Sequence, residues 1–289
     1  MSQPVSDTLA PWLERWHLKF ERRPAAPGGR EPYPGTGEVA FVRRDAQPLV
    51  LKLLPSGSDE WRSGEVLAHW EGLGAVRLVE QAPGAVLIER AHPGDDLAAL
   101  VQTGRDDEAT LILCEVMRQL NRPAPAGANF RTIVDWGQGF ARNRDAALRL
   151  GVEAGLIDQA SALFHRLCET QAEPVVLHAD LHADLQHYNV VRDVDRGWLA
   201  IDPKGVIGEP AYETGAMLRN PTADQALCAD SAIIDRRARL ICAELGYDYG
   251  RVVGWCFSQW VLAVLWAIQD DLPFAPSWLA GPLATRALL

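Results

Sequence analysis

The chain has 289 residues, of which 48% are apolar and 23% charged, so it is long enough to bury the core of an ordinary globular protein. Its net charge of −10 argues against a general nucleic-acid binder and suits a small cationic ligand better. No apolar run approaches the roughly 18–20 residues of a membrane span, and the start lacks the features of a signal peptide. We therefore expect a cytoplasmic monomer without a membrane or nucleic-acid partner.

The first third of the chain is predicted to consist mainly of strands. A helix is expected over residues 6–22, followed by a loop rich in Pro and Gly over residues 24–37. An amphipathic helix is expected over residues 60–71. Four segments have the composition of strands, and the first two of them form a hairpin: residues 38–43, 49–54, 75–80 and 85–90.

Helices dominate the remainder of the chain. Short strands at residues 175–177 and 198–201 flank a polar loop, and the tryptophan-rich tail is helical from about residue 222. Four earlier segments have helical spacing: residues 95–103, 108–121, 132–150 and 158–170. A sheet-rich first part followed by a helical second part predicts an α+β fold with two lobes.

The polar loop carries the residues whose chemistry is easiest to interpret. Residues 175–191, VVLHADLHADLQHYNVV, contain His182 and Asp184 followed by Asn189, which is the H-x-D-x-x-x-x-N spacing of protein-kinase catalytic loops. In that chemistry the aspartate orients the substrate hydroxyl and accepts its proton, while the asparagine binds magnesium. Asp202, at the end of the next strand, stands where a second metal-binding residue is expected. A capping aspartate in a turn is the alternative for a lone H-x-D.

Three further motifs, together with this loop, resemble aminoglycoside phosphotransferases, and in particular the streptomycin 6-kinase and hydroxyurea phosphotransferase branch. They are WLAIDPKG at residues 198–205, VIGEPAY at 206–212 and LRNP at 218–221. The resemblance implies a bilobal protein-kinase-like fold, with an N-lobe over residues 1–91 and a C-lobe over residues 92–289. It also implies ATP, or GTP, and Mg²⁺ as cofactors. The expected substrate is a small cationic aminoglycoside, streptomycin-like first, and its phosphorylation would confer resistance.

The same resemblance assigns nucleotide-binding residues in the N-lobe. Lys52 would hold the α- and β-phosphates with Glu65 as its ion-pair partner; the alternatives are an edge-strand lysine and a solvated glutamate. The glycine turn at residues 35–37 would cover the phosphates. Glu89 and Ala91 belong to the segment IERA, whose backbone would meet the adenine.

Four acidic residues are candidates for the substrate pocket. By resemblance, Glu209 and Glu213 lie where acidic side chains help to shape that pocket, with capping or surface roles as the alternative. Asp270 and Asp271 follow an apolar helix and either line a cation-binding cleft or simply end the helix.

The catalytic loop contains a tandem repeat. HADL at residues 178–181 is followed at once by HADL at 182–185, and deletion of either copy leaves an ordinary family loop. Asp184 is favoured as the base because it alone has Asn five residues later; alternatively, Asp180 keeps the usual place after the strand and the loop bulges. Since base and metal ligand must keep their geometry, we hypothesise that the repeat changes activity or substrate range.

Two other functions remain open at the level of the sequence. One is a metabolic kinase for a sugar, choline-like or other housekeeping substrate. The other is a catalytically weak, nucleotide-binding interaction module. A protein kinase is disfavoured, because no A-P-E-like end of an activation segment follows Asp202.

Overall fold

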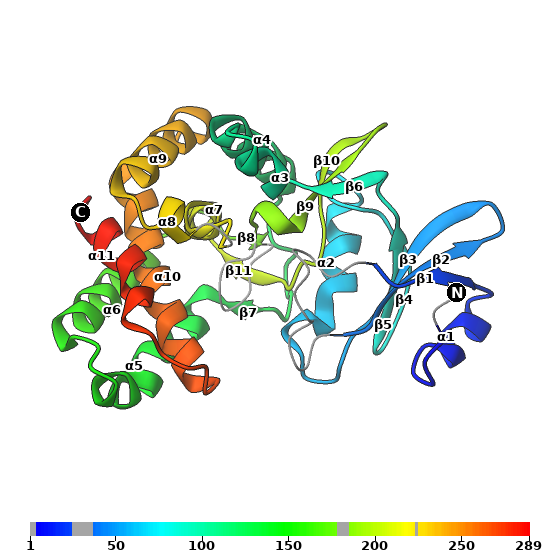
Figure 1. Cartoon of the computed structure of the whole chain (residues 1–289), viewed down its shortest axis with the longest axis horizontal. Helices are drawn as coiled ribbons and strands as arrows, with labels where there is room; N and C mark the ends of the chain where they lie inside the picture. Colours follow the sequence, from blue (N-terminus) through cyan, green and yellow to red (C-terminus); the bar gives the residue numbers. More distant parts are fainter. Residues whose placement is uncertain (1–3, 25–36, 178–184, 223–224) are drawn as a thin grey trace.

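The computed structural model describes residues 4–24, 37–177, 185–222 and 225–289. Its N-terminal part is a five-stranded antiparallel sheet in the order β1-β2-β3-β5-β4, blue to cyan in Figure 1. The strands are β1 (Lys19–Arg22), β2 (Val39–Arg44), β3 (Gln47–Leu53), β4 (Leu78–Ala82) and β5 (Ala85–Glu89). The expected hairpin is confirmed as β2 and β3, which pair from Val39 with Lys52 to Arg44 with Gln47.

Successive residues of β3 face opposite sides of this sheet, as the pleat of a strand requires. Leu49 and Leu51 are fully buried in a cluster that includes Leu9 and Trp16 from the N-terminal segment. Val50 and Lys52 face the other side, where both line a cavity between the sheet and the C-terminal part. The pleat thus explains why a lysine stands in an otherwise apolar strand.

The predicted helix over residues 6–22 is wrong in its second half. Only α1 (Ala10–Arg15) is helical, and the chain then reverses at His17, whose φ is 53°. The amide of Leu18 donates to the carbonyl of Leu13 at 2.8 Å, which closes a Schellman-type end. The following residues form β1 because they pair with β2. Apolar residues at helical spacing are therefore divided between a helix and a strand.

Two three-stranded sheets lie where the lobes meet. One has the order β10-β9-β6 and the other β7-β11-β8. Residues 95–103, expected as one helix, begin in a strand and become helical only at Ala98. The strands are β6 (Pro93–Asp96), β7 (Arg131–Thr132), β8 (Val175–Leu177), β9 (Val190–Asp193), β10 (Gly197–Ala200) and β11 (Val206–Gly208).

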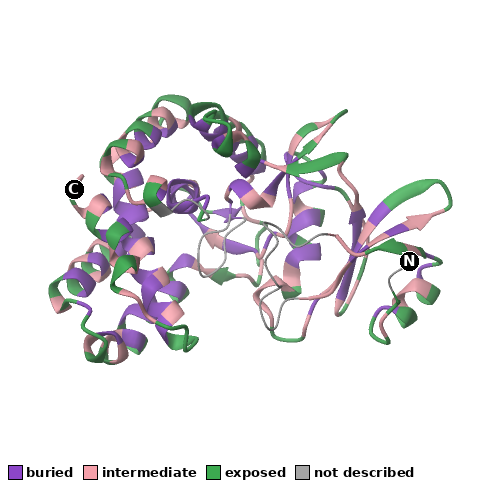
Figure 2. Cartoon of the chain, in the orientation of Figure 1, coloured by how far each residue is buried: buried purple, intermediate pink, exposed green. Residues whose placement is uncertain are grey.

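The rest of the C-terminal part is helical, as predicted. Its helices are α3 (Ala98–Gln102), α4 (Asp106–Leu120), α5 (Ile133–Arg149), α6 (Ala154–Glu169), α7 (Thr214–Arg219), α8 (Gln225–Cys228), α9 (Ser231–Leu245), α10 (Tyr249–Gln269) and α11 (Ala280–Arg286). Contrary to the sequence-based expectation, α10 is long and apolar enough to span a membrane, with a mean hydropathy of 1.5. It is the central helix of this part instead, since 78% of its most apolar window is buried (Figure 2).

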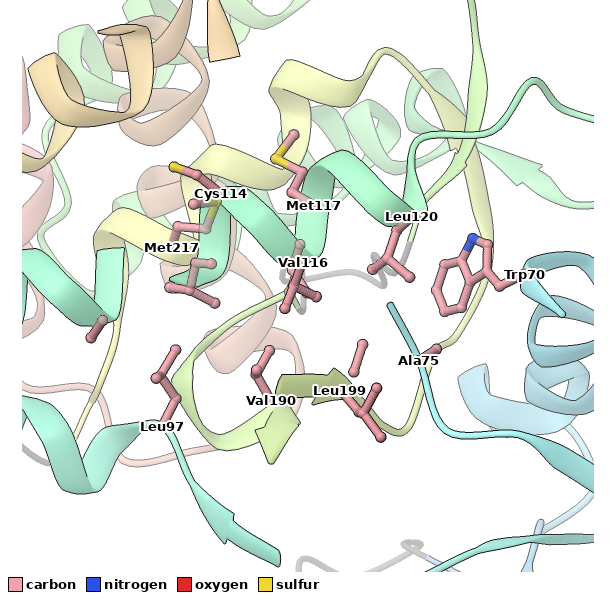
Figure 3. Close-up of a cluster of buried hydrophobic side chains, with 14 of the residues drawn as sticks. Trp70, Ala75, Leu97, Cys114, Val116, Met117, Leu120, Val190, Leu199 and Met217 are labelled. Carbon is pink, nitrogen blue, oxygen red and sulfur yellow. The ribbon is translucent and has the colours of Figure 1, made fainter. Parts of the chain in front are cut away.

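One apolar cluster anchors the strands that carry the expected metal ligands (Figure 3). Cys114, Met117 and Leu120 of α4 are buried in the same cluster as Val190 of β9 and Leu199 of β10. Trp70 and Ala75 of the N-terminal part join this cluster, and the amide of Val76 donates to the carbonyl of Ala200 at 3.0 Å. The β9–β10 hairpin therefore has a rigid, dry support shared by both parts of the chain.

Candidate active site

The most deeply buried cation of the sheet is Lys52. Its Nζ lies 2.8 Å from Oδ1 of Asp202 and 2.8 Å from Oε2 of Glu60, and its side chain is only 7% exposed. Burial by itself would lower the pKa of Lys52, but the carboxylates of Asp202 and Glu60 outweigh this effect and raise the pKa. Lys52 therefore keeps its charge at the inner end of the cavity. An edge-strand lysine is ruled out.

The expected pairing of Lys52 with Glu65 is wrong. Residues 59–62 form a 3-10 turn, η2 (Asp59–Arg62), and α2 (Ser63–Trp70) begins only after it. The turn carries Glu60 to Lys52, whereas Glu65 lies on the solvent side of α2 and accepts a hydrogen bond from Arg62 at 2.9 Å. Glu60 could have been found from the sequence, because it precedes the buried residues Ser63, Leu67 and Trp70 by three, seven and ten positions, on one helical face.

Asn189 and Asp202 are brought together by the β9–β10 hairpin, although thirteen residues separate them. Asn189 ends a 3-10 turn, η3 (His187–Asn189), directly before β9, and Asp202 follows β10. The amide of Ile201 donates to the carbonyl of Asn189 at 2.9 Å, which ties the two ends to each other. Asp202 has a φ of 56°, a conformation that non-glycine residues rarely adopt and that recurs at functional sites.

The amide oxygen of Asn189 and the carboxylate of Asp202 are hard oxygen donors of the kind that Mg²⁺ prefers. Among the described residues, no group of three His, Cys, Asp or Glu side chains is placed to enclose a metal alone. A magnesium site here fits a shared arrangement, in which one or two protein oxygens and nucleotide phosphates complete the octahedron.

A cavity of about 560 Å³ extends from Lys52 and Asp202 along the cleft between the sheet and the β9–β10 hairpin. Its walls are two apolar layers, which a planar base could enter. Val39, Phe41, Val50 and Ile88 line it from the sheet side, and Tyr188, Val191 and Ile201 from the hairpin side.

Glu89 and Ala91 both line this cavity at the segment that joins the two parts of the chain. The carboxylate of Glu89 accepts the amide N–H of Arg77 at 2.9 Å and pairs with Arg196. The amide N–H of Glu89 is used as well, because it donates to the carbonyl of Arg77 at 3.0 Å. The Glu89 side chain thus has a structural task, and contact of the backbone at Ala91 with adenine stays a prediction.

Asp184, Asp180 and the whole first copy of the HADL repeat lie outside the described residues, as do residues 35 and 36 of the glycine turn. Both flanks of the loop are described. Leu177 ends β8 and pairs with Val206 of β11, and the buried Leu185 donates its amide N–H to Glu213 at 3.3 Å.

The four acidic residues expected at a substrate pocket have other positions. Glu209 is 1% exposed and accepts hydrogen bonds from Arg251, at 2.6 Å, and from the indole of Trp255, so it holds α10 in place. Glu213 is 2% exposed and supports the backbone next to Asp184. The expectation that Glu209 and Glu213 face the substrate pocket is therefore wrong, because neither carboxylate reaches the surface.

Asp270 and Asp271 are exposed at the end of α10, and Asp270 is its C-cap residue. Their position agrees with the alternative that they end a helix, and their place in a cation-binding cleft stays a prediction.

His187, just before Asn189 in η3, was not singled out in the sequence. It is fully buried, and burial together with the nearby Arg237 lowers its pKa to about 3, so the ring is neutral. Its backbone carbonyl accepts the amide N–H of Leu97 at 2.9 Å. His187 thus packs the catalytic loop against the C-terminal core.

A buried lysine paired with an aspartate at an interlobe cavity, with an asparagine tied close to that aspartate, is an arrangement typical of kinase-like phosphotransferases. The family model described as "Aminoglycoside/hydroxyurea antibiotic resistance kinase" matches residues 26–271 of the chain. The chain therefore belongs to this family of antibiotic resistance kinases.

Individual relatives agree with this membership. The chain is 32% identical to streptomycin 3''-kinase of Klebsiella pneumoniae over 235 residues, which are 79% of this chain and 83% of that protein. It is 33% identical to hydroxyurea phosphotransferase of Kitasatospora aureofaciens over 91% of this chain and 73% of that protein. Streptomycin 6-kinase of Streptomyces griseus is 27% identical over 94% of this chain and 86% of its own length.

Solved structures confirm the bilobal α+β fold. A thermostable mutant of aminoglycoside phosphotransferase APH(4)-Ia, in a ternary complex with ADP and hygromycin B, superposes with a TM-score of 0.65 at 16% identity. That match covers 98% of this chain and 99% of the other. Choline kinase LicA from Streptococcus pneumoniae matches with a TM-score of 0.61 at 12% identity over the same shares of the two chains.

Proposed function

We propose that this chain is an ATP- and Mg²⁺-dependent O-phosphotransferase that phosphorylates a hydroxyl of a streptomycin-like aminoglycoside and so confers resistance. The observation that carries the proposal is the buried Lys52 held between Glu60 and Asp202 at the inner end of the interlobe cavity. The names of the relatives support the acceptor, because streptomycin kinases are among the proteins to which the chain is similar over most of its length.

Each residue of the centre has a proposed task. The ammonium of Lys52 binds phosphate oxygens and offsets their charge. Asn189 and Asp202 would hold Mg²⁺, which supplies charge neutralisation at the transferred phosphoryl group when bound. Asp184 orients the acceptor hydroxyl and takes its proton. Glu213 assists indirectly, since it holds the amide of Leu185, the residue after Asp184.

The proposed setting is a cytoplasmic monomer with no membrane or nucleic-acid partner and a small cationic substrate. We place the division of the lobes between residues 91 and 92. The five-stranded sheet ends with β5 at Glu89, and the next strand, β6, pairs with β9 of the other lobe.

The proposal is tested by mass spectrometry of streptomycin incubated with the protein, Mg²⁺ and either ATP or GTP, with hydroxyurea as a second acceptor. Addition of one phosphoryl group to streptomycin is expected. It should be lost in Asp184→Ala and retained in Asp180→Ala. The reverse pattern would move the base to Asp180, and an unchanged streptomycin with both nucleotides would refute the proposed acceptor.

The HADL repeat is tested with a variant that lacks residues 178–181. We expect its kcat/KM for streptomycin to differ from that of the full chain by up to about 100-fold, because a small displacement of the base has a large effect on rate. Identical kcat/KM values across streptomycin and other acceptors would contradict any role of the repeat.

A further inference from the structure

A second cavity, of about 520 Å³, lies beside the phosphoryl-transfer centre. It is lined by η2 and the loop before it, by Arg131 of β7, by Trp136 of α5 and by residues 204–206. Residue 204 is two positions beyond Asp202, and Val206 pairs with Leu177, the last described residue before the HADL repeat. The cavity therefore adjoins the segment that follows Asp202 and shares no lining residue with the nucleotide cavity.

Two arginine side chains at this cavity are held in the same way, each by a carboxylate and an aromatic ring. Arg62 donates to Glu65 at 2.9 Å, and its guanidinium carbon lies 4.2 Å from the centre of the Phe130 ring. A nitrogen of Arg131 lies 3.6 Å from Asp59, and its guanidinium carbon is 5.0 Å from the centre of the Trp136 ring. A carboxylate beside an aromatic face is the environment that a guanidinium group requires.

We propose that these two places are guanidinium-binding subsites for the acceptor, and that guanidino groups of the substrate exchange with Arg62 and Arg131. The inference rests on the proposed function and names the substrate class more narrowly. The streptidine ring of streptomycin carries two guanidino groups, whereas kanamycin carries only ammonium groups. An ammonium is more strongly hydrated than a guanidinium and lacks its planar fork of donors. It should therefore bind more weakly to the same carboxylate and aromatic ring.

In each ion pair one partner is largely exposed and the other partly exposed. The exposed fractions are 29% for Arg62 and 51% for Glu65, and 63% for Arg131 and 32% for Asp59, and such pairs contribute little to stability. A ligand guanidinium can therefore replace either arginine without breaking the core. The carboxylates stay where they are, because η2 and α2 are anchored by Glu60 and by the buried Leu67 and Trp70.

Trp136 gives an independent indication of a ligand at this cavity. The residue is 7% exposed, and its indole N–H has no hydrogen-bond partner among the described residues. Buried donors of this kind nearly always have an acceptor in native proteins. A ring hydroxyl of the substrate would supply one next to the Arg131 subsite.

The subsites also connect acceptor binding with the nucleotide site. Glu60, which holds Lys52, stands between Asp59 and Trp61, both of which line the second cavity. One short turn thus contributes Asp59 to this cavity and Glu60 to Lys52, which lines the other cavity.

The test is binding of streptidine, measured by calorimetry without nucleotide, so that it does not depend on turnover. Glu65→Gln and Asp59→Asn should each weaken binding by about 10-fold, and Arg62→Gln should strengthen it by about 3-fold because a competitor is removed. The matched controls are Glu108→Gln and Arg105→Gln, since Arg105 and Glu108 form an exposed pair with the same spacing on α4. Thermal melts verify that every variant is folded.

Weaker binding in both acidic variants together with tighter binding in Arg62→Gln would support the subsites, and weak binding of kanamycin would support the guanidinium preference. If the Arg62–Glu65 pair is only structural, Glu65→Gln and Arg62→Gln should both weaken streptidine binding, and that result would overturn the inference. A streptidine affinity that no variant alters would overturn it as well.

Kinetics separate the subsites from the proposed function. If streptomycin is phosphorylated but its KM is the same in Glu65→Gln and Glu108→Gln, the subsites are refuted while the proposed function stands. Glu65-dependent streptidine binding without any phosphorylation would refute only the function.

Discussion

Two buried ion-pair sites of the molecule differ in whether they open into a cavity. At the lobe interface, the ammonium of Lys52 pairs with two carboxylates, Glu60 and Asp202, and Lys204 lies close enough to act on the charge of Glu60. In the C-lobe, two aspartates at the start of α4 face two arginines of α9. The pairs are Arg236 with Asp106, Arg237 with Asp106, and Arg236 with Asp107.

The difference separates a functional site from a structural one. The C-lobe site is balanced and closed, because Arg237 is 1% exposed and also donates to the carbonyl of Asn220 at 2.7 Å. The interface site opens into a cavity. That opening leaves room for a metal ion and phosphates, whereas the closed site can only hold α4 and α9 together.

The largest effect on activity is expected from Lys52→Met. The change removes the ammonium that pairs with Glu60 and Asp202 and takes away the proposed phosphate contact. We expect kcat/KM to fall by about 10²–10³-fold. The measurement is steady-state phosphorylation of streptomycin, with Arg105→Gln on the outer surface as the control. A fall of less than about 3-fold would mean that Lys52 has no catalytic role at this site.

Asp106→Ala should lower stability and leave activity nearly unchanged, in contrast to Lys52→Met. It leaves the buried Arg237 without its carboxylate, which destabilises a protein by about 3–5 kcal/mol. Because Asp106 lines neither cavity at the lobe interface, kcat/KM of the folded protein should remain nearly unchanged. Urea unfolding and kinetics at low temperature check the two halves of this prediction.

The C-lobe site also predicts a pH dependence. Burial alone would raise the pKa of Asp106, but hydrogen bonds from Arg237 and Arg236 outweigh it and lower the pKa below the ordinary value of 3.8. A depressed pKa contributes stability that is present above 3.8 and is lost as the pH falls through the folded-state value. The free energy of unfolding of Asp106→Asn should therefore depend less on pH below 3.8 than that of the unaltered chain. Parallel curves would contradict the assignment.

A smaller effect should distinguish Glu60 from Glu65. Glu60→Gln removes one of the two carboxylates that hold Lys52, and we expect it to lower kcat/KM by about 10-fold with either streptomycin or hydroxyurea as acceptor. Glu65→Gln breaks only an exposed pair and should change the free energy of unfolding by less than about 1 kcal/mol. Chemical denaturation and kinetics of both variants provide the measurement. If Glu60→Gln and Glu65→Gln lower kcat/KM equally with hydroxyurea as acceptor, Glu65 is also a partner in the nucleotide site.

The parts of the site that are local in sequence could be predicted. Asn189 and Asp202 were singled out from catalytic-loop spacing and from a strand end, which are local patterns, and the structure places them at the two ends of the β9–β10 hairpin. Lys52 was found because a charge inside an apolar strand needs a buried partner. The identity of that partner was missed, since it depends on where η2 ends and α2 begins, and such boundaries are set by packing.

The sequence by itself determined the sheet-rich first part, the helical second part, the catalytic motifs and the family, because all of these depend on residue type at short spacing. Tertiary structure alone decided that Glu209 and Glu213 are internal supports, since their partners, Arg251 of α10 for Glu209 and the amide of Leu185 for Glu213, lie far from them in the sequence. It alone brought Arg62 and Arg131 to one cavity from residues far apart in the chain. Such long-range neighbours arise from the folding of layers onto one another, which no local pattern records.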